Sequence, residues 1–93
     1  MIETIDETTV GDLDGVRVPM GNMTTGRYTL PDGSEQQGII CSLALPGRVG
    51  VFVGRGSVVD VEGTLWRVVH IEKPPGALGS VTLERLRGGS RDG

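Results

Sequence analysis

Residues 58–86 decide the fold, and they read VVDVEGTLWRVVHIEKPPGALGSVTLERL. Two runs rich in β-branched residues, 58–61 and 64–72, flank the dipeptide Glu62-Gly63, and a third run, 80–86, follows a Pro/Gly-rich connection. A two-residue loop ending in Gly between such runs is typical of a β-hairpin, because Gly accepts the positive φ angles of tight hairpin turns. The stretch therefore predicts a hairpin to which a third strand is added.

The loop also fixes the register of this hairpin. With Glu62-Gly63 as the loop, Val61 opposes Thr64, Asp60 opposes Leu65 and Val59 opposes Trp66. Strict alternation then places on one face Val59, Val61, Trp66 and Val68, with His70 toward its end. The opposite face holds Val58, Asp60, Leu65, Arg67, Val69 and Ile71. We expect the first face to be core, and an ion pair between the diagonal neighbours Asp60 and Arg67 on the second.

The rest of the chain repeats this pattern of short β-prone runs separated by Gly and Pro. The expected upstream strands are residues 8–10, 16–18, 27–30, 35–45 and 48–53, with residues 21–26 as a loop. Apolar residues never recur at helical spacing over ten or more positions. The sequence thus predicts an all-β fold: a small antiparallel meander of about eight short strands, closed into a barrel or folded as a two-sheet sandwich, with no regular helix.

The length of 93 residues corresponds to one domain. We expect an acidic N-terminal arm over residues 1–7, a single β-domain over 8–86 and a flexible tail over 87–93. Only three residues are aromatic, whereas 16 are Gly and five are Pro. Because large rings supply much of the burial in small cores, this domain must be closely packed or gain stability by pairing with another chain.

Charge and composition exclude several classes of function. The net charge of −3 and the single Lys do not provide the basic stripe that nucleic acid requires. No apolar run approaches the length of a membrane span, and no signal peptide is recognisable, so we expect a cytoplasmic protein without nucleic-acid or membrane partners. Cys41 has no second cysteine with which to form a disulfide, and its apolar strand predicts a buried structural thiol.

Few residues have the spacing of a catalytic or metal site. His70 and Glu72 are two apart on one strand, so both point the same way, but one His and one carboxylate are fewer than the ligands a metal needs. We therefore expect no metal, no cofactor and no catalytic residue. The alternative is a small-molecule-binding barrel, catalytic in one version, whose cleft lies near Trp66, His70 and Glu72.

The main hypothesis is a non-catalytic, accessory module that binds a protein partner or a second copy of itself. The second face of the hairpin is too apolar to be fully exposed, which predicts that another surface covers it. Recognition would use an exposed strand edge or this face together with the loop at 73–79. The predicted binding residues are Val58, Leu65, Arg67, Val69, Ile71 and Leu78.

Residues 56–86 contain the pattern Val-x-Gly-x-x-Trp-x-Val-x-x-Ile-Glu, which begins at Val61 and ends at Glu72. In this pattern the stretch resembles small uncharacterised bacterial all-β domains of unknown function. The resemblance implies a bacterial all-β domain and agrees with the predicted fold class. It implies no reaction, because a fold carries no function by itself.

Overall fold

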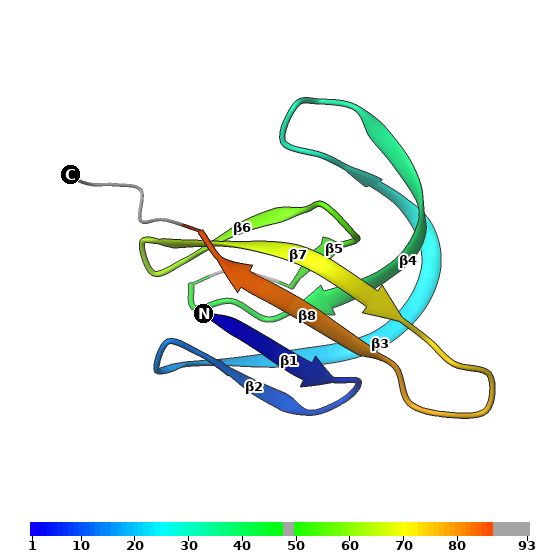
Figure 1. Ribbon diagram of the computed structural model, residues 1–93, viewed down its shortest axis with the longest axis horizontal. Helices are drawn as coiled ribbons and strands as arrows, with labels where there is room; N and C mark the ends of the chain where they lie inside the picture. The colour runs from blue at the N-terminus through cyan, green and yellow to red at the C-terminus, as the bar shows by residue number, and fades with distance from the viewer. Residues whose placement is uncertain (48–49, 87–93) are drawn as a thin grey trace.

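The structure, a computed structural model, describes residues 1–47 and 50–86 and contains eight strands in two antiparallel sheets (Figure 1). The strands are β1 (Ile2–Asp6), β2 (Val10–Leu13), β3 (Val16–Thr29), β4 (Glu35–Leu43), β5 (Val51–Val53), β6 (Val58–Val61), β7 (Thr64–Glu72) and β8 (Ser80–Arg85). One sheet has the order β1-β8-β7-β6 and the other β2-β3-β4-β5. The all-β prediction is confirmed, and none of the described residues is helical. The sandwich alternative fits, since no strand pairing among these residues closes the sheets into a barrel.

The hairpin β6–β7 has the predicted register, and β8 is the added third strand. Val61 pairs with Thr64, Asp60 with Leu65 and Val59 with Trp66. The φ angles of Glu62 and Gly63 are 53° and 91°, both in the left-handed region, as a type I′ turn requires. Asp60 supports this turn, because its carboxylate accepts a 2.7 Å hydrogen bond from the Gly63 N–H. Local turn chemistry therefore sets the register of the hairpin.

The predicted inner face of this hairpin is core up to Val68. Trp66 and Val68 have no solvent exposure, and Val59 and Val61 are buried beside them. The second sheet contributes the facing side chains, which include Leu13, Val18, Met20, Met23, Cys41, Leu43 and Val53. Aliphatic and sulfur-containing side chains thus fill the core around one indole ring, as the low aromatic content requires.

A β-bulge in β7 overturns the predicted faces beyond this point. Val68 pairs with Leu83 but His70 pairs with Thr82, so Val69 is an extra residue in the strand. An extra residue reverses the alternation of side chains that follows it. As a result, Ile71 pairs with the buried Val81 and packs against the core, whereas His70 lies on the exposed face. The prediction that Ile71 belongs to the outer face and His70 to the inner face is wrong.

A second irregularity lies in β3, where residues 21–26 were expected to form a loop. They instead belong to a strand of 14 residues that pairs with β4, and the register shifts between Met20 and Met23. This bulge lets both methionines face the core although they are an odd number of residues apart. The predicted loop is wrong because pairing with the long strand β4 overrides the turn-forming tendency of the local sequence.

The N-terminal residues are part of the sheet rather than a separate arm. β1 pairs with β8 along its whole length, from Ile2 opposite Glu84 to Asp6 opposite Ser80 (Figure 1). Ile5 is 1% exposed, and its side chain fills the space over Gly11 in β2. Residues 2–6 of the expected acidic arm therefore form a strand of the first sheet. The predicted tail, residues 87–93, lies outside the described residues.

The hairpin β3–β4 extends beyond the sandwich and curls back over the turn that follows β5 (Figure 1). Tyr28 in β3 donates a 2.9 Å hydrogen bond from its hydroxyl to the Arg55 carbonyl oxygen. Its ring occupies the space that a Cβ at the buried Gly54 would need. Gly54 is therefore required for close approach of the ring, and this contact brings the end of β3 beside β5 and β6.

Glycines in these connections give a test of the packing. An alanine Cβ at the buried Gly79 would lie closer than van der Waals contact to the Met23 sulfur and the Glu72 carbonyl oxygen. Because the backbone cannot yield easily, we expect Gly79→Ala to lower the free energy of unfolding by about 2 kcal/mol. Urea denaturation measures this change. Gly38→Ala is the control, since nothing lies within 4 Å of its Cβ position, and an equal loss in both variants would contradict the packing.

Candidate functional site

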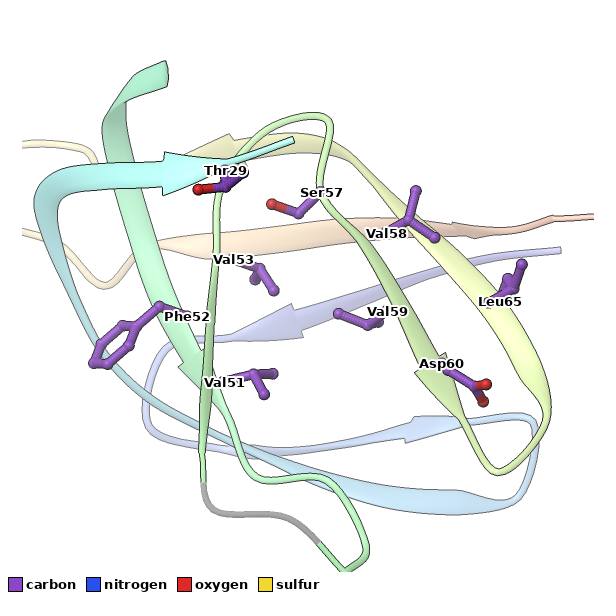
Figure 2. Close-up of a pocket in the computed structure, with 9 residues that line it drawn as sticks. All are labelled: Thr29, Val51, Phe52, Val53, Ser57, Val58, Val59, Asp60 and Leu65. Carbon is purple, nitrogen blue, oxygen red and sulfur yellow. The ribbon is translucent and has the colours of Figure 1, made fainter. Parts of the chain in front are cut away.

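The two sheets are open on the side where β5 and β6 are their outermost strands. A slot of about 330 Å³ lies there, between the two strands (Figure 2). Its lining residues are Thr29, Val51, Phe52, Val53, Ser57, Val58, Val59, Asp60 and Leu65. This volume is near the lower end of the range for small-molecule pockets. The slot also leaves open space beside the edge of β6.

Hydrogen bonding in the hairpin determines which backbone groups of β6 face the slot. The Leu65 carbonyl accepts a 2.9 Å bond from the Leu86 N–H, so the peptide groups of Leu65 point toward β8. Its partner Asp60 is therefore in a non-hydrogen-bonded pair, and the backbone N–H and C=O of Asp60 point away from β7. The same alternation directs those of Val58 outward. β6 thus presents two consecutive outward-facing backbone positions at the slot.

The side chains at the slot are mainly apolar. Val51, Val53 and Val59 are directed between the strands, whereas the Phe52 ring points away from β6 (Figure 2) and is 63% exposed. The Ser57 hydroxyl accepts a 3.0 Å bond from the Gly54 N–H, and the Asp60 carboxylate is bonded to its own turn. The polar side chains here therefore stabilise local turns, and they do not converge on a common point as catalytic groups do.

The structure brings together only part of the predicted binding face. Val58 and Leu65 are half-buried and line the slot, and Arg67 is exposed directly opposite Val58. Leu78 is 62% exposed, but it lies in the β7–β8 connection at the far end of β7 from the turn. The predicted ion pair is absent: within the described part of the chain, Asp60 and Arg67 form no salt bridge with each other or with another residue.

The residues of the alternative ligand site, Trp66, His70 and Glu72, do not lie on one face. Trp66 has no solvent exposure, and its indole N–H has no hydrogen-bond partner among the described residues. His70 is on the exposed face, where its Nε2 lies 2.7 Å from the Glu72 carboxylate oxygen. The bulge at Val69 therefore places the His70 imidazole on the exposed face, whereas the Trp66 ring is buried. Among residues 1–47 and 50–86, no three metal-ligating side chains are clustered.

Glu7 is the residue with the most unusual surroundings, and sequence reasoning missed it. It is 5% exposed, and its carboxylate accepts hydrogen bonds from the Met23 N–H at 3.0 Å, the Gly79 N–H at 3.0 Å and the Lys73 ammonium at 2.6 Å. Lys73 also donates to the Ala77 carbonyl at 3.1 Å. The carboxylate therefore joins β3 in one sheet to the β7–β8 connection of the other. The only sequence signal was that Lys73 is the sole lysine.

Glu7 and the nearby Cys41 both have shifted pKa values. The hydrogen bond from Lys73, followed by those from the Gly79 and Met23 amides, lowers the pKa of Glu7 from 4.5 to about 2. Burial, followed by the negative charge of Glu7, raises the pKa of the Cys41 thiol to about 12. A carboxylate fixed in this way cannot act as a base near neutral pH, and a thiol with this pKa is not a nucleophile. Both residues have structural roles.

The Glu7 carboxylate should make stability depend on pH. Its pKa is lower in the folded than in the unfolded state, so its contribution is complete above about pH 4.5 and is lost as the pH falls toward about 2. We expect Glu7→Gln to reduce the free energy of unfolding at pH 7 and to flatten its decrease across this acid range. Urea titrations at several pH values measure both effects. The exposed Glu35→Gln is the control, and an unchanged acid slope in Glu7→Gln would contradict the assignment.

Cys41 should be unreactive in the folded protein. Because its thiol is buried and its pKa is about 12, we expect no measurable labelling by a thiol-specific disulfide reagent at pH 8 in the native state, and complete labelling in urea. Absorbance of the released thiolate follows the reaction. Rapid native labelling would show that Cys41 is accessible and would reopen it as a candidate nucleophile.

The comparisons with known proteins identify no relative from which a site could be transferred. No protein-family model, curated protein or solved structure matches this chain. Within its described residues, the chain also has no helix with the length and apolar character of a membrane span.

Proposed function

We propose that this chain is a non-catalytic protein-binding module that recognises its partner through the strand edge at the slot. The observation that carries this proposal is the outward direction of the backbone N–H and C=O groups of Val58 and Asp60. The edge of an outermost strand such as β6 is a template for an added strand, and extended segments bind to such edges in many recognition domains. The main-chain hydrogen bonds would supply affinity, and the apolar lining of the slot would select side chains.

The distribution of reactive groups supports binding rather than catalysis. Cys41 is buried with a raised pKa, the Glu7 carboxylate is occupied by three donors, and the exposed His70 is hydrogen-bonded to Glu72. General acid–base or nucleophilic chemistry needs such groups to converge on one concave site. The slot holds instead valine side chains and turn-stabilising polar groups, which suit an extended apolar strand.

A matched pair of hairpins allows this proposal to be tested. Asp60 precedes the turn of β6–β7 and accepts a bond from Gly63 N–H, and Asp12 precedes the turn of β2–β3 and accepts a 2.7 Å bond from Gly15 N–H. Both aspartates lie in outermost strands. Proline at either position removes one outward N–H and one turn-stabilising carboxylate, so the two substitutions differ mainly in the edge that they block.

We expect linear peptides selected from a displayed random library to bind the wild-type protein. Asp60→Pro should weaken that binding about tenfold or more, because one hydrogen bond from the edge of β6 is lost and the proline ring disturbs pairing with the peptide. Asp12→Pro should leave binding unchanged. Fluorescence anisotropy of the labelled peptides measures the affinities. Peptides that bind Asp60→Pro and wild type equally, or whose binding is lost only in Asp12→Pro, would contradict recognition at β6.

A further inference from the structure

The edge of β6 also has the properties that pairing with an identical strand requires. In an antiparallel pair of two copies related by a two-fold axis perpendicular to the sheet, directly opposed residues must lie on the same face. The outward-facing positions are Val58 and Asp60. The axis can therefore pass through Val58, Val59 or Asp60, which gives three registers to compare.

Two of these registers are unfavourable. An axis through Asp60 places the two Asp60 carboxylates directly opposite each other, and like charges in that position destabilise a sheet. An axis through Val58 places Asp60 opposite Gly56, which precedes the strand and has a φ of 93°. An axis through Val59 instead pairs Val58 of each copy with Asp60 of the other, so that every outward-facing group of both residues is bonded.

The same register gives charge complementarity between the copies. Within one copy, Arg67 in β7 lies directly opposite Val58 in β6. In the paired copies, Asp60 of the second copy would lie directly opposite Val58 on its other side. All three lie on the outer face, where Arg67 has a side chain long enough to cross Val58. Within the described residues, neither Asp60 nor Arg67 has a salt-bridge partner in the single chain. Two symmetric ion pairs would therefore form only between copies.

We propose that the partner at this edge is a second copy of the chain, joined by antiparallel β6–β6 pairing centred on Val59. The first sheets of the two copies would form one continuous sheet, with Arg67 of each copy bound to Asp60 of the other. This inference rests on the proposed function, because it uses the same strand edge. It adds the identity of the partner, the register and the residues that determine specificity.

Charge reversal tests the register. Asp60→Lys places two cations together across the interface, and Arg67→Glu places two anions together. We expect a wild-type dimer in light scattering over a dilution series, and at least about tenfold weaker dimerisation for each variant alone. When the two variants are mixed, a heterodimer contains one copy of each. In this heterodimer, both contacts between positions 60 and 67 again join opposite charges. Mixing should therefore restore dimerisation, which an effect within one chain cannot explain.

Controls separate this result from loss of folding. Asp12→Lys and Arg17→Glu make the same charge changes in the β2–β3 hairpin, where the two residues are direct cross-strand partners, and they should leave the dimer unchanged. Circular dichroism confirms that each variant is folded, and Asp60→Asn, which keeps the turn acceptor, should weaken the dimer less than Asp60→Lys does. Equal dimerisation of all variants, or no recovery on mixing, would overturn the register.

The outcome also separates this inference from the proposed function. A wild-type protein that stays monomeric up to about 1 mM overturns the second copy as partner. If that monomer still binds displayed peptides and loses them in Asp60→Pro, the strand edge remains a protein-binding site for a different partner. If it binds no peptide, both proposals fail together.

Discussion

The structure depends on one buried charge, the carboxylate of Glu7. It follows β1 of the first sheet, accepts a hydrogen bond from Met23 in the second sheet, and binds Gly79 and Lys73 in the β7–β8 connection. A buried carboxylate is costly unless its oxygens are occupied, and here three donors occupy them. The interaction therefore joins elements that are far apart in the sequence, directly after the N-terminal strand that pairs with β8.

This interaction also makes the two sides of the sandwich different. On the Glu7 side, β1 and β2 lie close together, with the Ile5 side chain over Gly11, and Arg85 in β8 binds Asp14 at 3.1 Å. On the opposite side, no comparable charged contact joins β5 to β6 among the described residues, and a slot separates them. The slot therefore lies on the side that Glu7 does not join, and the recognition that we propose uses the strand edge on that side.

Two β-bulges adapt the sheets to this arrangement. The bulge in β3 allows Met20 and Met23 both to face the core and leaves the Met23 N–H directed at Glu7. The bulge in β7 turns Ile71 inward and His70 outward. It therefore places His70 on a different face from Trp66, and it removes Ile71 from the outer apolar face that the sequence had suggested. The recognition that we propose therefore uses the edge of β6 and not the face of β7.

The sequence alone determined the features that turn chemistry and side-chain alternation control over a few residues. These features are the all-β class, the register of β6–β7, the burial of Trp66 and Val68, and the burial of Cys41, and the structure confirms each of them. Only the tertiary structure decided the strand order, the long β3, the two bulges and the pairing of Glu7 with Lys73. Those two residues are 66 positions apart. Hydrogen bonds in a turn are encoded within four residues, whereas a bulge or a buried ion pair depends on partners that only the folded chain brings into contact.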